Sequence, residues 1–396
     1  MNRYNVLEYG VKADCEALQT AGIQHCLDLC REGGGTVVIP RGCFYVSSLR
    51  LWSDTTLYLE RGARLIGSED CEDYETYPIP EGMEMRSDME LITQYYADSK
   101  SRTYGERFWA HYRRAILTAY GEKNIAIVGE CDSVIDGRHC YDPEGEEGYR
   151  GPHIVFLSCC ENVTLEGYTA QNAGNFLHEA NNCRNLVMRH VTCLAGSDGI
   201  HLHCTENAVI EDCLFKTGDD CIAGINIQNM TVRRCVLNTS CNLFRMGGVG
   251  ILVEDCYAYG PGYYPHRMTV VKGRGDELPR TQGRHTLLRV VDYFASTNYL
   301  YTPSDIHFRN CAFEGIRSVL KYNADVGPLQ SGTHWGELTM DNVRLTDVRE
   351  TSTPTAPAEE PFSIKLKNVT YSFAEGATDT ELFTLPEGCN TTLSVE

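Results

Sequence analysis

The chain has 396 residues, of which 42% are hydrophobic and 22% charged, a composition typical of a soluble globular protein. Its formal net charge of −19 argues against nucleic-acid binding, because phosphate recognition needs a basic surface. No apolar run reaches the roughly 18 residues of a membrane span, and the first residues lack the apolar core of a signal peptide. We therefore expect a cytoplasmic protein with no membrane contact.

The sequence contains 19 cysteines. In a reducing compartment such a number predicts buried thiols that pack as small hydrophobic side chains. A structural zinc site is the alternative, but paired Cys-x-x-Cys knuckles are absent from the sequence. We predict no bound metal and no cofactor.

The first predicted element is a short amphipathic helix between Asp14 and Arg31, ended by the glycines at 33–35. Its apolar residues fall near one face: Leu18, Ile23, Cys26, Leu27 and Cys30. We expect residues 1–40 to cap the first open edge of the structure that follows, since an exposed strand edge promotes aggregation.

A repeat of about 22 residues predicts the rest of the fold. Each unit opens with a marker residue and continues as a short alternating strand and a turn, and the markers are Asn162, Asn185, Asn207, Asn229 and Gly250. Such a unit buries its apolar face only when units stack. The period fits one coil of a parallel β-helix, whereas the signature of a leucine-rich repeat is absent from the sequence. We predict an all-β parallel β-helix, a single domain over residues 1–396 with loop excursions at 70–112 and 261–303.

Equal positions in successive coils should stack about 4.8 Å apart. Cys213, Cys235 and Cys256 each follow their marker by the same number of residues and should form one column. We interpret this column as a core stack of small apolar side chains rather than a thiol or metal ladder.

A second predicted column carries the candidate chemistry. It contains Asn175, Asp198, Asp220 and Asn242, with Asp219 beside Asp220. Three neighbouring carboxylates repel one another, so at least one pKa should rise, and a pair with separated pKa values can supply an acid and a base. Inverting glycosidases hold their two carboxyls roughly 6.5–9.5 Å apart, which the diagonal from Asp198 to Asp219 could meet. A solvated turn and a Ca²⁺ site are the alternatives.

Several motifs also occur in a familiar order: residues 4–10, 33–40 and 57–63, then Asp136-Gly137, Gly196-Ser-Asp-Gly199 and Thr217-Gly-Asp-Asp-Cys-Ile-Ala223. Over roughly residues 4–256 the chain thereby resembles glycoside hydrolase family 28, the polygalacturonase family. The resemblance implies a right-handed β-helix that hydrolyses galacturonic-acid-type glycosides with inversion. It further implies that Asp219 is the general acid and that Asp198 and Asp220 activate the water.

The chain departs from the family pattern at three motifs. Gly196-Ser197-Asp198 replaces Asn-Thr-Asp, and Asn242 stands where a Gly-His-Gly motif would place a helper histidine. Asparagine forms hydrogen bonds but does not titrate. The Arg-Ile-Lys motif, which grips the substrate carboxylate, is matched best by Val319-Leu320-Lys321, which keeps only the lysine. Arg317 and Lys321 share a strand face in the predicted alternation, so a shifted clamp is our hypothesis.

Further polar residues near the aspartates are candidates for substrate binding. His201 follows Asp198 on the same predicted strand, and Arg245 follows Asn242. Tyr263, Tyr264, His266 and Arg267 belong to an insertion that could line a cleft and bind a sugar; a self-packed surface loop is the alternative. The predicted substrate-binding set is His201, Asn242, Arg245, His266, Arg267, Arg317 and Lys321.

Together these features predict an inverting glycoside hydrolase that acts at the chain ends of acidic or pectin-derived oligosaccharides. The oligosaccharide is the predicted partner, and the sequence carries no indication of oligomeric state. A calcium-dependent polysaccharide lyase on the same scaffold and a catalytically inactive carbohydrate-binding protein are the alternatives.

Overall fold

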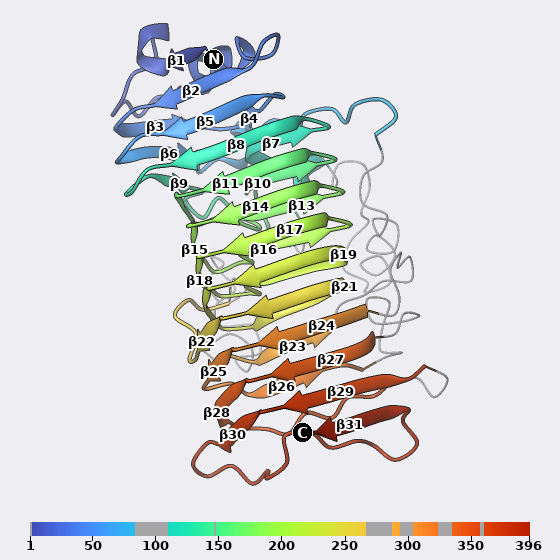
Figure 1. Ribbon diagram of the computed structural model, residues 1–396. Helices are drawn as coiled ribbons and strands as arrows, with labels where there is room; N and C mark the ends of the chain where they lie inside the picture. The colour runs from blue at the N-terminus through green and yellow to red at the C-terminus, as the bar shows by residue number, and fades with distance from the viewer. Residues whose placement is uncertain are drawn as a thin grey trace.

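The computed structural model describes residues 2–83, 110–145, 148–266, 287–293, 304–323, 335–356 and 360–396. Within these residues the chain winds into a stack of β-coils, with the N-terminus at one end and the C-terminus at the other (Figure 1). This arrangement confirms the predicted right-handed parallel β-helix.

Two parallel sheets form the described coils. The larger sheet contains β1 (Arg3–Asn5), β2 (Gly35–Ile39), β4 (Leu49–Arg50), β5 (Thr55–Leu59), β7 (Ala115–Tyr120), β8 (Lys123–Gly129), β10 (His153–Ser158), β11 (Glu161–Glu166), β13 (His178–Asn181), β14 (Arg184–Arg189), β16 (Ile200–His203), β17 (Glu206–Glu211), β19 (Ile222–Arg233), β21 (Asn242–Glu254), β23 (Arg289–Tyr293), β24 (Ser304–Arg309), β26 (Ser318–Lys321), β27 (Trp335–Asp341), β29 (Phe362–Lys367) and β31 (Thr391–Val395). The smaller sheet contains β3 (Gly42–Val46), β6 (Ala63–Gly67), β9 (Val134–Asp136), β12 (Thr169–Gln171), β15 (Thr192–Ala195), β18 (Leu214–Thr217), β20 (Val236–Thr239), β22 (Tyr257–Tyr259), β25 (Ala312–Glu314), β28 (Arg344–Val348) and β30 (Thr370–Phe373). Three consecutive strands, for example β10, β11 and β12, make one coil, and each pairs in parallel with its counterpart in the next.

The repeat markers occupy a tight turn at one corner of each coil. Asn162, Asn185, Asn207 and Asn229 all have left-handed backbone conformations, with φ between 56° and 58°. Asparagine and glycine adopt this conformation more readily than other residues, and the last marker, Gly250, has a φ of 67°. The asparagine amides also form a ladder, with Nδ2 of each residue donating to Oδ1 of the preceding one at 2.9–3.3 Å. The marker therefore fixes both the turn and the register of the stack.

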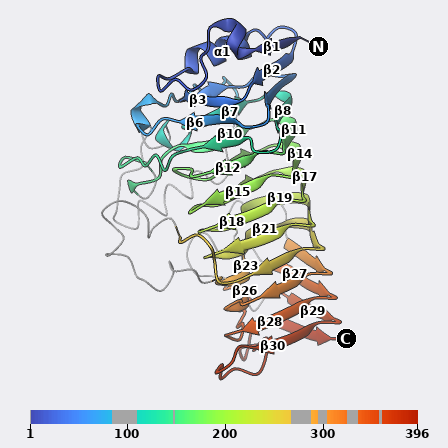
Figure 2. The same ribbon diagram turned by 90° about the vertical axis from the view of Figure 1, so that its left-hand side faces the viewer.

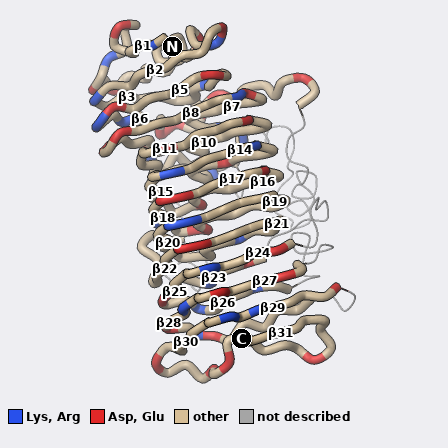
Figure 3. The backbone as a smooth tube through the Cα atoms, viewed as in Figure 1, with Lys and Arg blue, Asp and Glu red and all other residues tan. Residues whose placement is uncertain are grey.

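The interior of the helix is filled by columns of apolar side chains. Cys213, Cys235 and Cys256 stack with Cys311 in the buried core, which confirms the predicted cysteine column. Each of these thiols points to a backbone carbonyl oxygen at 3.6–3.8 Å. Figure 3 marks the positions of acidic and basic residues along the coils. On the outer surface some of these side chains pair across neighbouring coils, as in Arg189–Glu166 at 2.8 Å.

The N-terminal cap is present but its helix is shorter than predicted. The α-helix α1 (Thr20–Asp28) packs at the first coils (Figure 2), together with the 3₁₀-helix η1 (Val6–Tyr9). A second 3₁₀-helix, η2 (Cys71–Asp73), follows β6. The predicted start at Asp14 is wrong because Asp14 and Cys15 pair instead with β3: the amide of Asp14 donates to the carbonyl oxygen of Cys43 at 2.8 Å. Leu18, expected on the apolar face, is 43% exposed.

Candidate active site

The three aspartates predicted as catalytic lie in two neighbouring turns of the helix. The turn between β15 and β16 carries Asp198, and the turn between β18 and β19 carries Asp219 and Asp220. The turns stack closely, because the amide of Gly199 donates to the carbonyl oxygen of Asp220 at 3.0 Å. All three side chains are buried, and each offers a carboxylate oxygen within 4.8 Å of the other two. The structure therefore brings together the predicted column.

This spacing is shorter than the diagonal expected between Asp198 and Asp219. One oxygen of each lies within 4.8 Å of the other, whereas inverting glycosidases typically separate their carboxyls by roughly 6.5–9.5 Å. Inversion therefore rests on the family resemblance and not on the distance.

The carboxyl of Asp220 is held by Asn242 of the next coil. Its Oδ1 accepts hydrogen bonds from the backbone amide of Asn242 at 3.2 Å and from Nδ2 of the same residue at 2.7 Å. Burial, followed by the charge of Asp219, raises the pKa of Asp220 to about 6, while Arg245 and Asn242 oppose this rise. The pKa of one of the crowded carboxyls, that of Asp220, therefore rises as expected, although burial contributes more than repulsion.

Asp219 faces a histidine from the insertion that follows β22. Nε2 of His266 lies 3.2 Å from Oδ2 of Asp219. Gly218 permits this approach, since a Cβ at that position would lie 2.0 Å from the carbonyl oxygen of Pro265. The structure therefore supports the predicted place of His266 beside the aspartates.

Asp198 also has a histidine neighbour, from its own coil. Nδ1 of His201 lies 3.6 Å from Oδ2 of Asp198 and 3.8 Å from Oε2 of Glu179, a fully buried residue of β13. The ring of Phe176 packs edge-on against that of His201, with the centroids 4.4 Å apart. His201 therefore contacts the aspartate column as predicted, whereas Glu179 is absent from the predicted set.

A strip of charged residues continues from Asp220 toward the C-terminal coils. In the register of the sheet, Arg245 of β21 stands beside Asp292 of β23, which stands beside Lys321 of β26. Arg289 donates from the same guanidinium nitrogen to Oδ1 of Asn242 at 3.3 Å and to Oδ2 of Asp292 at 3.0 Å. Nζ of Lys321 lies 3.5 Å from Oδ2 of Asp292. Three cationic groups thus gather beside the aspartates around one acid.

Arg289 of this strip was not among the residues predicted to bind substrate. Arg289 is the residue of the next coil that pairs with Asn242 in the register, whereas the predicted match Val319-Leu320-Lys321 lies one coil further on. Arg317 lies just before β26 and forms an ion pair with the half-exposed Glu350 at 2.8 Å. Lys321 pairs with a different acid, Asp292, so these ion pairs do not bring Arg317 and Lys321 together in one clamp. The remaining predicted residue, Arg267, lies outside the described residues.

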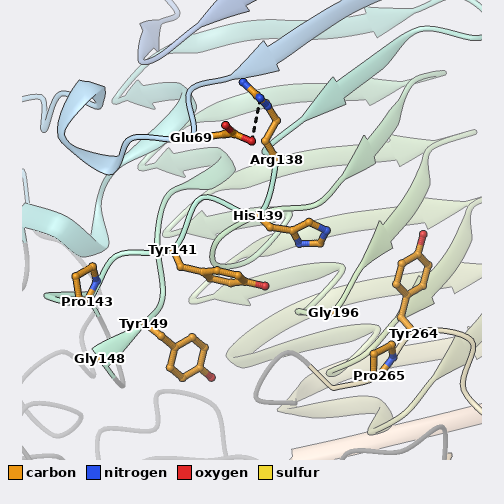
Figure 4. A pocket seen from close by; sticks show the side chains of 10 residues that line it. All are labelled: Glu69, Arg138, His139, Tyr141, Pro143, Gly148, Tyr149, Gly196, Tyr264 and Pro265. Atoms are coloured by element: carbon orange, nitrogen blue, oxygen red, sulfur yellow. Dashed lines mark ion pairs between the residues drawn. The ribbon is translucent and has the colours of Figure 1, made fainter. Parts of the chain in front are cut away.

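A cavity of about 770 Å³ opens next to the aspartate turns (Figure 4). Gly196, two residues before Asp198, forms part of its wall, and Tyr264 and Pro265 line it just before His266. Tyr141, Tyr149, His139 and Arg138 also line the cavity. Arg138 is held by Glu69 at 2.9 Å. The predicted aromatic insertion therefore contributes Tyr264 to a cavity, whereas the ring of Tyr263 is 64% exposed.

Three groups of side chains in the described part of the chain have donor atoms close enough to hold a metal ion. They are Asp198 with Asp219 and Asp220, Asp219 with Cys241 and His266, and Glu179 with His201 and His203. No helix among the described residues is both long and apolar enough to cross a membrane.

The chain is similar to known proteins over part of its length. The family model described as glycosyl hydrolases family 28 matches residues 81–247. An exo-poly-alpha-D-galacturonosidase from Dickeya chrysanthemi is 26% identical over 266 residues, which cover 55% of this chain and 41% of that protein. A probable polygalacturonase from Vitis vinifera is 25% identical over 235 residues, which cover 55% of this chain and 43% of that protein. The chain thus spans less than half the length of these relatives.

The fold agrees over a greater length. The solved polygalacturonase from Erwinia carotovora ssp. carotovora superposes with a TM-score of 0.64, covering 95% of this chain and 96% of that one at 14% identity. Over residues 81–247 and in its fold the chain is thus similar to the polygalacturonases of glycosyl hydrolase family 28.

Proposed function

We propose that the chain hydrolyses glycosidic bonds of acidic, pectin-derived oligosaccharides at Asp219, Asp220 and Asp198. The observation that carries this proposal is the group of three buried carboxyls on adjacent coils. Acid–base cleavage of a glycoside needs one carboxyl that donates a proton and another that accepts one.

In the proposed reaction Asp219 gives its proton to the leaving glycosidic oxygen while a water molecule attacks the anomeric carbon from the opposite face. Asp220 accepts the proton of that water as a carboxylate, and Asp198 orients the water as a hydrogen-bond acceptor. The old C–O bond breaks as the new one forms, with inversion of configuration. Asp219 ends as a carboxylate, and His266, 3.2 Å away, is placed to return a proton to it.

The two sides of the aspartates differ in chemistry, and this difference supports an acidic substrate. Arg245, Arg289 and Lys321 lie along the strip beyond Asp220, where they can pair with a sugar carboxylate. The other side opens into the cavity lined by Tyr141, Tyr149 and Tyr264, whose rings can stack on a sugar face. Cleavage at a chain end is the finer part of the proposal, and the exo-acting relative from Dickeya chrysanthemi supports it.

The proposal is tested by product analysis on labelled pectic oligosaccharides of defined length. We expect wild type to release a saturated, terminal product, and Asp219→Asn and Asp198→Asn each to lower kcat by ~10²-fold or more. Asp132→Asn is the matched control, since Asp132 is an exposed turn residue that should leave kcat unchanged.

Other results of the same product analysis would support a lyase or a carbohydrate-binding protein. An unsaturated, ultraviolet-absorbing product would replace hydrolysis with a lyase reaction. Binding without turnover, unchanged in Asp219→Asn, would make the chain a carbohydrate-binding protein. NMR of the newly formed anomer decides between inversion and retention.

A further inference from the structure

Four buried polar side chains form a square on the outer face of β13 and β16. Glu179 and Asn181 belong to β13, and His201 and His203 belong to β16. The parallel register places Glu179 beside His201 and Asn181 beside His203. The residues between them along each strand point into the hydrophobic core, so the four side chains share the opposite face.

This square is shielded from solvent. Glu179, Asn181 and His203 are 0% exposed and His201 is 9% exposed. On the preceding strand the register partner of Glu179 is Phe156, which packs in a separate buried cluster with Tyr112, Ala115 and Tyr120. A nearby positive charge stabilises a carboxylate that is buried in this way.

The donor atoms of the square are spaced for a single ion. Glu179, His201 and His203 each offer one ligand atom, and all three atoms lie within 4.8 Å of one another. The two imidazole centroids are 4.3 Å apart. Bonds of roughly 2.0–2.2 Å to a central ion would place such ligands about 3–4 Å apart, which small side-chain rotations can reach.

The contacts of Tyr112 and Asn181 indicate that the square is built around a ligand. The hydroxyl of Tyr112 donates to Oε1 of Glu179 at 3.2 Å, while Oε2 lies on the side of His201. Such a hydrogen bond is typical of the residues that orient metal-bound carboxylates. Both polar atoms of the Asn181 side chain are buried with no hydrogen-bond partner among the described residues. Buried amides are normally satisfied, and an ion or its bound water beside His203 would satisfy this one.

We propose that Glu179, His201 and His203 bind one divalent transition-metal ion of the Zn²⁺ class, with Asn181 as a fourth ligand or a partner of its bound water. Two imidazoles and one carboxylate favour such an ion over Ca²⁺ or Mg²⁺, which prefer oxygen ligands. The ion holds His201 in one orientation, and through Nδ1 of that ring, 3.6 Å from Oδ2 of Asp198, it positions the aspartate. Its binding does not depend on the proposed hydrolysis.

The test measures metal binding by the whole chain. Protein stripped with a chelator is titrated with Zn²⁺ by calorimetry, and the metal retained after dialysis is determined by elemental analysis. We expect one equivalent in wild type and at least about tenfold weaker binding in Glu179→Gln and in His203→Ala. His25→Ala removes an exposed histidine of α1 and should bind as wild type does.

The remaining measurements distinguish metal binding at this site from binding at the aspartates, and a loss of ligands from a loss of the fold. Asp219→Asn should keep full affinity, so a loss there would move the ion to one of the two groups that contain Asp219 and overturn the proposal. Circular dichroism checks the fold of each variant. If His203→Ala does not fold, Co²⁺ bound to wild type decides: a four-coordinate site gives intense visible bands, whereas the octahedral site typical of all-oxygen ligation gives weak ones. No binding by wild type, or equal binding by all variants, refutes the site.

Discussion

The carboxyl of Asp220 should make the stability of the protein depend on pH. Burial, then the charge of Asp219, raises its pKa from 3.8 to about 6. The folded protein therefore holds this proton more tightly than the unfolded chain does. The resulting contribution to the free energy of unfolding is fully present below pH ~4 and is lost as the pH rises through about 6. At pH 7 the protein has therefore lost about 3 kcal/mol of this contribution to its free energy of unfolding relative to pH ~4.

The Asp220→Asn variant isolates this effect because asparagine keeps the shape of the side chain and an oxygen that accepts from Asn242. We expect the free energy of unfolding of the variant, relative to wild type, to increase between pH 4 and pH 7 by up to about 3 kcal/mol. Urea unfolding followed by tryptophan fluorescence measures this difference at each pH. Asp132→Asn, at an exposed turn, should follow wild type throughout. If the free energies of unfolding of Asp220→Asn and wild type change in parallel with pH, the raised pKa of Asp220 is refuted.

The same ionisation should appear in the activity. Asp220 accepts a proton only as a carboxylate, so kcat/KM should fall with decreasing pH below about 6. An acidic limb lying below pH ~4.5 in wild type would contradict both the raised pKa and the role of Asp220 as the base.

Three further predictions follow from the contacts of single residues. Arg245→Met removes a cation that favours ionised Asp220, so the acidic limb of kcat/KM should move to higher pH, as pH–rate profiles of variant and wild type would show. Asn207→Ala should lower the free energy of unfolding by about 1–2 kcal/mol, and Asn207→Gly by less, because the φ of 57° suits glycine while both variants lose the ladder bonds; equal losses in urea unfolding would contradict this. Alkylation of the native protein, followed by mass spectrometry, should modify the exposed Cys131 quickly and Cys235 in the core column only on unfolding.

The fold could be predicted because its repeat leaves a local mark in every coil. A left-handed turn residue is needed at one corner, so Asn162 and its counterparts recur with the period of the coil. Counting from these markers places Asp198 and Asp220 correctly, since no insertion separates their coils.

The same counting fails where the chain leaves the helix. Asn242 pairs with Arg289, which is 47 residues further along the chain, whereas the repeat has a period of about 22 residues. Counting by the period therefore does not reach Arg289, and the strand of the next coil is not predicted. Glu179 was missed for a different reason. Outward-facing positions of a strand are normally exposed, and the burial of this face depends on contacts such as that with Tyr112, which are distant in the sequence.

The resemblance to glycosyl hydrolase family 28 implies a histidine at the position of Asn242, and the neighbours of Asn242 explain why an amide fits there. Its Nδ2 donates to Asp220 while its Oδ1 accepts from Arg289, so the position needs a donor and an acceptor on one side chain. A protonated histidine would lose the acceptor and bring a second cation against the guanidinium. A histidine does contact Asp219, but it is His266 of the insertion that follows β22. This residue lies outside the paired strands, so a substitution there leaves the pairing of the coils unchanged.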